Sequence, residues 1–441
     1  MRRICLTLPT NRACPAMVTA IGEEAAYAAA HFDVEVHLLV LDSSDAYPEH
    51  ARALHSAHGV PRVVVHHLDE AEQRDFLRRV IHRTEHTKHE LLLDLMLPAG
   101  LSYGACTNRA FLIAVALGCE SVHRRDSDSR YQVLRGETVF PVHQELLSLG
   151  KRASDAAHGV GETALAPEHT RKRVAMVAGS FLGELSVDID EIRRLDPDVY
   201  YDVVGLWAPG HWSDEQKREL VEESFQGPRT GPFTGDLTTL TVVDPMHVDM
   251  CNISFHQVHE RVPLPPATDT IGSDYFLIHL VHAAALPGVL HNRHIVNFYT
   301  GERRTDPGFM AYQLRFAKFF LSMLYFNFLY DEMAEAGEAL LDDRGQVRAS
   351  AIAELARKST LLDQAENVQR LDTIEAAYRK LGGRYATFAA FLTSHRERLL
   401  DEAQSDIADF ALLVEAWEAL VRAARDTALA QAPERPGRRS R

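Results

Sequence analysis

Short apolar runs alternate with longer amphipathic segments through the first hundred residues, and this alternation constrains the fold more than any other feature. The expected elements, in order, are strand 3–8, helix 15–30, strand 34–41, helix 50–58, strand 60–66, helix 70–86 and strand 91–95. Strands separated by helices pair in parallel through right-handed crossovers. The sequence therefore predicts an α/β fold in which helices cover both faces of a sheet.

Polar loops follow three of the expected strands. They lie at 9–12, 42–45 and 126–128, and two of the three are acidic. Ligands of open α/β sheets bind beyond the carboxyl ends of the strands, so we expect these loops to meet at one site. Neither a G-x-G-x-x-G nor a G-x-x-x-x-G-K-[ST] motif is present, which argues against a dinucleotide fold and a P-loop.

The stretch 102–130 contains the strongest candidate for chemistry. A helix with an apolar face is expected to end near Gly118, and a short strand then leads into Asp126 and Asp128. Carboxylates two positions apart in an extended chain point the same way, which suits a divalent cation that also holds phosphates. The alternative is a solvated acidic turn.

Composition limits the class of protein and its partners. The 441 residues carry a formal net charge of −15, which argues against non-specific nucleic-acid binding. No apolar run is long enough for a membrane span, and the first one stops at Pro9, too early for a signal peptide. The five cysteines show no C-x-x-C spacing, so we expect free thiols in a reducing cytoplasm.

The order of four motifs resembles the nucleotide-sugar-binding half of a GT-A fold glycosyltransferase of the family 2 type. The motifs are LPTNR at 8–12, VLDSSD at 40–45, TNRA at 107–110 and RRDSDS at 124–129. The resemblance covers roughly residues 1–300. It implies a Rossmann-like three-layer sandwich, a nucleotide-diphosphate sugar as donor, and Mn²⁺ or Mg²⁺ bridging the diphosphate.

The resemblance also implies roles for individual residues. They are Thr10 and Arg12 along the nucleotide, Asp42 at the base or ribose, Asn108 and Arg109 at the diphosphate or donor sugar, and Asp126 and Asp128 at the metal. Arg124 and Arg125 depart from the family pattern, in which apolar residues are more usual. They either neutralise phosphate, which makes Arg125 a further substrate-binding candidate, or pair with neighbouring acids. Asp42 also suits a helix N-cap or a turn.

A later block, 240–304, is similar to the acceptor half of such enzymes. On that analogy Asp274, at the start of a predicted helix, is the catalytic base, and His291 or His294 is a third metal ligand. The apolar alternation after the histidines favours a strand, which would point the two side chains to opposite faces, so at most one would reach the metal. An N-cap acid and ordinary packing histidines are the alternatives.

From residue 306 the sequence becomes rich in helix-forming residues. We expect a catalytic domain over 1–305, with a nucleotide-binding half at 1–130 and an acceptor half at 170–305, an α-helical domain over 306–431 and a disordered tail over 432–441. The helical domain would serve either homo-oligomer contacts or coverage of the acceptor.

The predicted function is a cytoplasmic, metal-dependent glycosyltransferase that moves a sugar from a nucleotide-diphosphate donor to a hydroxyl or amine of a small molecule or glycan. It requires Asp126 and Asp128 beside Asp42 in one cleft. A non-catalytic interaction protein of the same fold would instead have these acids dispersed or paired with Arg124 and Arg125. A nucleotidyltransferase is less favoured, because no Gly-rich, Arg-containing loop follows Leu8. Inverting and retaining outcomes stay equally open.

Overall fold

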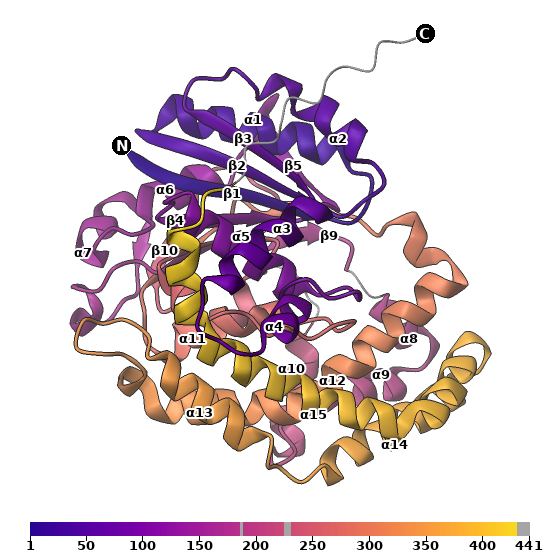
Figure 1. Cartoon of the computed structure of the whole chain (residues 1–441). Coiled ribbons are helices and arrows are strands. Elements are labelled where there is room, and N and C mark those ends of the chain that lie inside the picture. Colours follow the sequence, from indigo (N-terminus) through magenta and orange to yellow (C-terminus); the bar gives the residue numbers. More distant parts are fainter. Residues whose placement is uncertain (186–187, 225–230, 430–441) are drawn as a thin grey trace.

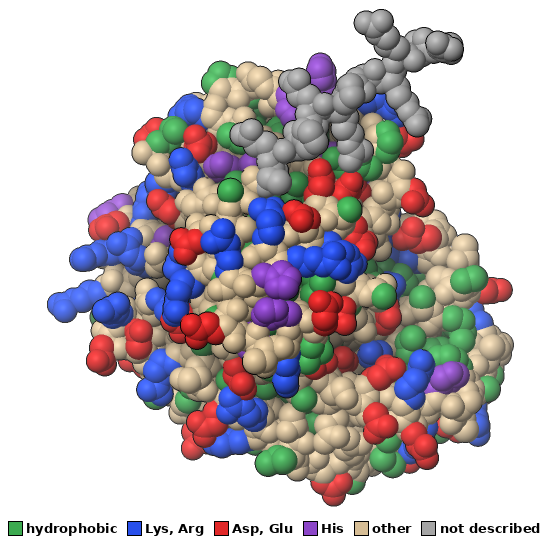
Figure 2. Space-filling view, viewed as in Figure 1, with side chains coloured by type: hydrophobic (Ala, Val, Ile, Leu, Met, Phe, Trp, Pro, Cys, Tyr) green, Lys and Arg blue, Asp and Glu red, His purple; other side chains and the backbone are tan. Residues whose placement is uncertain are grey.

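The computed structural model describes residues 1–185, 188–224 and 231–429. The tail predicted to be disordered, 432–441, lies outside them. Figure 1 shows a twisted sheet with helices packed against it and the C-terminal helices gathered below it in that view. Acidic and basic side chains are interspersed over the face in Figure 2.

The large sheet has nine strands in the order β3-β2-β1-β4-β11-β8-β12-β10-β7. Their bounds are β1 (Arg2–Thr10), β2 (Val34–Asp42), β3 (Val63–Asp69), β4 (Ser121–Arg125), β7 (Glu162–Thr163), β8 (Met176–Ala178), β10 (Thr238–Thr241), β11 (Asn252–His256) and β12 (Gly288–His291). β1 to β4 are parallel, as the strand–helix alternation predicts. β11 runs antiparallel to both β4 and β8, so the complete sheet is mixed.

A smaller sheet has the order β6-β5-β13-β9. It consists of β5 (Ser129–Leu134), β6 (Glu137–Val139), β9 (Phe181–Gly183) and β13 (Ile295–Asn297). β5 begins one residue after Asp128, so this sheet holds the chain that leaves the acidic turn.

Helices cover both faces of the parallel part of the large sheet. On one face lie α1 (Pro15–His31) and α2 (Tyr47–Ala53), and on the other lie α3 (Glu70–His82), α4 (His89–Met96) and α5 (Tyr103–Ala116). The other helices before residue 306 are α6 (Val142–Ser148), α7 (Ala153–Ala156), α8 (Ile189–Leu195), α9 (Pro197–Val204), α10 (Asp214–Glu223) and α11 (Phe276–Ala283). Strand alternation divides the core: Ile4, Leu6 and Leu8 of β1 belong to the apolar cluster around α1, while Cys5 belongs to the cluster around α5. The α/β prediction is confirmed.

The prediction of a strand at 91–95 is wrong, because this run lies in α4. Leu92, Leu93 and Met96 are buried whereas Leu91 and Asp94 are exposed, which is the period of a helix. A short apolar run does not distinguish the two structures by itself.

Four long helices complete the chain and pack on the α5 side of the sheet. They are α12 (Asp306–Ala336), α13 (Ala349–Ser359), α14 (Ala365–Leu381) and α15 (Gly383–Arg425). α15 runs for 43 residues without a break, since neither Pro nor Gly interrupts it after its start. The structure thus confirms a helical C-terminal region. Among the described helices, none is both long and apolar enough to cross a membrane.

One apolar core joins the helical region to the sheet. The rings of Phe276 in α11 and Phe410 in α15 lie 4.8 Å apart in an edge-to-face arrangement. Trp417 of α15 is fully buried and donates a hydrogen bond from Nε1 to the carbonyl oxygen of His259 at 2.9 Å. The division of the chain at residue 305 remains a prediction.

Candidate active site

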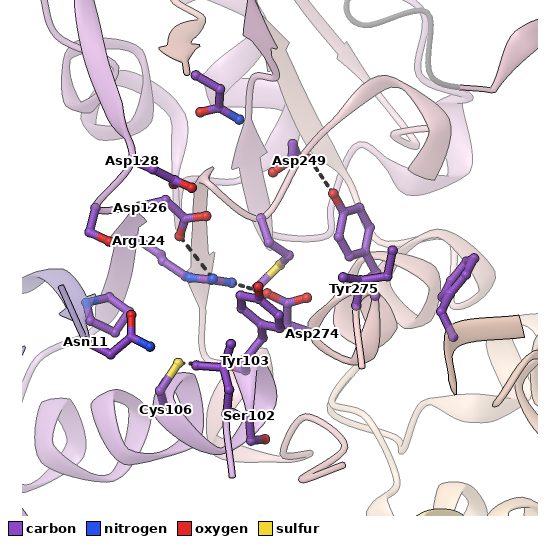
Figure 3. A pocket seen from close by; sticks show the side chains of 18 of the residues that line it. Asn11, Ser102, Tyr103, Cys106, Arg124, Asp126, Asp128, Asp249, Asp274 and Tyr275 are labelled. Carbon is purple, nitrogen blue, oxygen red and sulfur yellow. Dashed lines mark hydrogen bonds and ion pairs between the residues drawn. The ribbon is translucent and has the colours of Figure 1, made fainter. Parts of the chain in front are cut away.

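A cavity of about 530 Å³ lies at the carboxyl ends of β1 and β4. Its walls come from the loop after β1, the turn after β4, the start of α5, the segments around 245–250 and 271–275, and α12. Figure 3 shows the polar side chains that meet there. The expectation that the loop after β1 and the acidic turn at 126–128 meet at one site therefore agrees with the position of this cavity.

Four aspartates line the cavity, Asp126, Asp128, Asp249 and Asp274, and two glutamates, Glu70 and Glu223, line it as well. Asp126 directly follows β4. β11 pairs antiparallel with β4, and its first residue, Asn252, lies opposite Arg125. The chain just before β11 therefore brings Asp249 to the same edge as Asp126. Asp274 lies in the short 3₁₀ turn Ser273–Tyr275 that leads into α11.

Arginines hold these acids in place. Arg124 donates to Asp126 at 3.0 Å and to Asp274. Asp128 pairs with Arg12, at 3.4 Å, and with Arg303. Positive and negative groups thus alternate across the polar end of the cavity, as Figure 3 shows for Arg124 and its two partners.

The four acids are crowded enough to disturb one another. Burial raises the pKa of Asp126 to about 6. Arg124 opposes this shift, whereas the charges of the three other acids add to it. A bound cation would relieve this repulsion, so the crowding favours a cation-binding role for the cluster.

The donor set fits a hard divalent cation. Asp126 accepts a hydrogen bond from Arg124 through Oδ1. Asp128 accepts from Arg12 and from Arg303, both through Oδ2. Within the described part of the chain, the second oxygen of each makes no hydrogen bond. Carboxylate oxygens are the ligands that Mg²⁺ and Mn²⁺ prefer, and phosphate oxygens commonly complete their coordination.

Asp249 was not found from the sequence. Tyr275 donates its hydroxyl proton to one carboxylate oxygen, and the backbone N–H of Cys251 donates to the other at 2.9 Å. Asp249 therefore positions Tyr275 at the cavity wall (Figure 3). No local pattern marks this residue, because it reaches the site only through the antiparallel pairing of β11.

Several residues predicted from the sequence do line the cavity. They are Thr10, Arg12, Arg109, Asp126, Asp128 and Asp274. Arg109 is mostly buried and donates to Gln73 at 2.8 Å and to the carbonyl of Met96 at 2.7 Å, so it ties α5 to α3 and α4. Asn108 is fully buried outside the lining and exchanges two hydrogen bonds with the backbone of Leu264.

Asp42 lies behind the cavity wall, with only 1% of its surface exposed, while its neighbours Leu41 and Ser43 line the cavity. It accepts hydrogen bonds from Ser44, His50 and His67. Burial would raise the pKa of Asp42, but these bonds hold it well below its usual range. Asp42 is therefore a turn residue, which was the alternative to its predicted role at the base or ribose, since the Ser44 N–H donates to its carboxylate at 2.9 Å.

Asp42, His50 and His67 also offer three possible metal-ligand atoms within 4.8 Å of one another. His50 Nε2 accepts the N–H of Cys14 at 2.9 Å, so Nδ1 carries the proton that His50 donates to Asp42 at 2.7 Å. Both ring nitrogens of His50 are therefore engaged. The cluster is a hydrogen-bonded network that holds the loop before α1.

Arg125 and the two late histidines lie away from the cavity lining. Arg125 is fully buried and pairs with Glu24 at 2.8 Å and with Glu145 at 3.0 Å, so it follows the acid-pairing alternative. His294 Nδ1 accepts the N–H of Ser180 at 3.0 Å, and His291 is buried at the end of β12. These positions give no support to the predicted role of His291 or His294 as a metal ligand.

The fold and the cavity together define an α/β protein with a ligand cleft lined by acids and arginines. The chain belongs to the family of unknown function DUF6271, whose model matches residues 2–433. No curated protein matches the sequence. A solved structure described as mannosyltransferase PcManGT from Pyrobaculum calidifontis, in complex with GDP-Man and Mn²⁺, is similar at 14% identity and a TM-score of 0.35. The match covers 94% of this chain and 88% of that one.

Proposed function

We propose that this protein is a metal-dependent glycosyltransferase of GT-A type, which moves a sugar from a nucleotide-diphosphate donor to an acceptor hydroxyl or amine. One observation carries the proposal. Asp126 and Asp128 meet Arg12, Arg124 and Arg303 in a cavity at the carboxyl ends of parallel strands. A diphosphate requires both kinds of group, a cation on carboxylates and guanidinium donors for its remaining oxygens.

Each side chain has a part in this proposal. Asp126 and Asp128 would hold Mn²⁺ or Mg²⁺, which when bound neutralises the charge of the leaving diphosphate. Arg12 and Arg303 would bind phosphate oxygens. Asp274 would accept the proton of the acceptor as its oxygen or nitrogen bonds to the anomeric carbon and the bond to the diphosphate breaks. The ion pair with Arg124 holds the Asp274 side chain in place.

Two observations also favour the non-catalytic alternative. Asp42, which the glycosyltransferase prediction requires beside Asp126 and Asp128 in one cleft, lies behind the cavity wall. Asp126 and Asp128 are already neutralised by arginines, and Arg124 is one of them, as that alternative requires. The two candidates differ in whether a nucleotide and a metal bind together at these acids, which a binding experiment decides directly.

The test is a thermal-shift screen of UDP, GDP, CDP, ADP and TDP, each with and without Mn²⁺. We expect one nucleotide to raise the unfolding midpoint only with the metal, because a ligand at 100 times its Kd stabilises by about 2.7 kcal/mol. Asp128→Asn should remove this shift. Asp343→Asn, at an exposed position away from the cavity, is the matched control and should keep it. No shift with any nucleotide would favour the non-catalytic alternative.

A further inference from the structure

The cavity has two chemically different ends. The acids and arginines described above form the polar end. Another part of the lining is apolar and comes mainly from α12, with contributions from two other segments. It consists of Trp207, Ile271, Phe319, Met323, Phe326 and Tyr330. We call these six residues the apolar wall.

The apolar wall reaches almost to the proposed base. Gly272 has φ +77°, and a Cβ built on it would lie 2.9 Å from the ring of Phe319, so this ring packs directly over the glycine. The ring of Trp207 stands edge-on to Phe319, with 5.6 Å between the centroids. Gly272 is two residues before Asp274. Phe319 therefore packs on the turn that carries Asp274, the residue that would accept the proton, and both residues line the cavity.

The polar groups that α11 and α12 contribute to the lining beside the apolar wall, His279 and Ser322, carry no charge. His279 lines the cavity and stacks on Tyr330 with 3.8 Å between the ring centroids. Burial lowers the pKa of His279 to about 3, so its imidazole is neutral near pH 7. Ser322 of α12 donates its hydroxyl proton to the carbonyl of Phe319 at 2.7 Å. Glu223 of α10 also lines the cavity, as a charged group outside α11 and α12.

We infer that the acceptor is a small molecule that carries an aromatic or alicyclic ring next to its reacting hydroxyl, with the ring seated on the apolar wall. This inference rests on the proposed function. Aromatic and aliphatic side chains gain from covering an apolar ring, whereas each hydroxyl of a sugar placed there would lose its hydrogen bonds to water without replacement. A glycan acceptor therefore suits this end of the cavity poorly.

In the step that follows from this placement, the acceptor oxygen forms a bond to the anomeric carbon of the donor sugar. The bond from that carbon to the diphosphate oxygen breaks, and its electron pair leaves with the nucleoside diphosphate. The hydroxyl proton passes to Asp274. Products are the glycosylated ring compound and the nucleoside diphosphate, and no other reactant is needed.

The probe is 4-methylumbelliferone, an aromatic bicycle with one hydroxyl, titrated against the full chain and followed by quenching of tryptophan fluorescence. Two variants act on the apolar wall. Ser322→Phe fills that end of the cavity, and Phe319→Ala removes a ring from it. Ala311→Phe, at an exposed position of the same helix outside the lining, is the matched control. We expect Ser322→Phe and Phe319→Ala each to weaken probe binding at least tenfold and Ala311→Phe to leave it unchanged.

Nucleotide binding is measured on the same variants by the metal-dependent thermal shift. Retention of that shift in Ser322→Phe, together with lost probe binding, supports the inference. Wild-type protein that shows the nucleotide shift but transfers sugar to methyl glucoside and not to the probe overturns it, while the glycosyltransferase proposal stands. Probe binding that is sensitive to Ser322→Phe without any nucleotide shift overturns the glycosyltransferase proposal but supports an apolar ring as the ligand.

Discussion

At the scale of single residues, Arg124 and Arg125 are neighbours in one strand, yet their identical side chains have different roles. Successive residues of β4 point to opposite faces of the sheet. Arg124 reaches the cavity and holds Asp126 and Asp274, while Arg125 is buried on the other side with Glu24 and Glu145. The first is therefore placed for function and the second for stability.

The buried ion pair predicts a pH-dependent loss of stability. Burial raises the pKa of Glu145, but Arg125 and His123 outweigh it and hold this pKa at about 2. A carboxyl whose pKa is depressed on folding stabilises the protein above about pH 4 and loses that effect as the pH falls toward 2. Glu145→Gln should lower the free energy of unfolding at pH 7 by about 3 kcal/mol, because it leaves Arg125 one partner short.

Urea denaturation at pH 7 and at pH 3 measures this effect. The difference between wild type and Glu145→Gln should shrink at the lower pH. Glu137→Gln, on an exposed residue of β6, should stay within about 0.5 kcal/mol of wild type at both values. A difference that is the same at pH 3 and pH 7 would show that the charge of Glu145 is not what stabilises the fold.

The proposed base gives a second prediction at this scale. Asp274→Asn should lower kcat for sugar transfer by about 10²- to 10⁴-fold, the usual contribution of a general base. Nucleotide binding with Mn²⁺ should persist, because Asp126 and Asp128 are untouched. Steady-state kinetics beside the thermal shift separates the two effects, with Asp343→Asn as the control. Unchanged kcat would remove Asp274 from the mechanism.

At the scale of elements, α5 is fixed by a close approach to the backbone around Pro265. A Cβ on Gly104 would lie 1.9 Å from the carbonyl oxygen of Pro265, and Asn108 one turn later exchanges two hydrogen bonds with Leu264. The N-cap residue Ser102 donates to the carbonyl of Pro266 at 2.9 Å. These contacts set the position of the helix end that carries Tyr103 and Cys106 into the cavity.

Gly104→Ala should therefore separate α5 from this segment and lower the free energy of unfolding by about 1–3 kcal/mol, the range observed for overpacking. Gly159→Ala is a suitable control, because nothing lies within 4 Å of the added Cβ and the backbone there does not need glycine. Chemical denaturation of both variants measures the change in the free energy of unfolding. Equal stability of Gly104→Ala and wild type would mean that α5 can shift without cost.

Elements also show what the sequence could predict. The parallel pairing of β1 to β4 follows from local periodicity. The same periodicity predicted that Asp126 and Asp128 lie at the end of a strand. Asp249 escaped prediction because the insertion of β11 beside β4 depends on long-range pairing that no local pattern records. Asn108 carries the type of side chain that a ligand site uses, yet it satisfies backbone groups in the interior. Residue type alone does not separate these two roles.

At the scale of the whole molecule, the continuous apolar core predicts one cooperative unfolding transition. The rings of α11 and α15 pack together, and α15 also covers α5. Circular dichroism and tryptophan fluorescence should therefore give coincident thermal transitions, since helix content reports the whole chain and the fluorescence reports the surroundings of Trp207, Trp212 and Trp417. Two separated transitions would instead establish residues 306–431 as an independent domain.

The packing of α15 on α5 has a consequence for synthesis of the chain. Phe111 of α5 and Trp417 of α15 both contact His259, one through its ring at 5.1 Å between centroids and the other through its carbonyl oxygen. A ribosome that adds about 5–20 residues per second takes roughly 15–60 s to travel from one of these residues to the other. Throughout that interval the apolar face of α5 lacks its final cover. The nascent chain therefore exposes this apolar face to solvent until α15 has been synthesised.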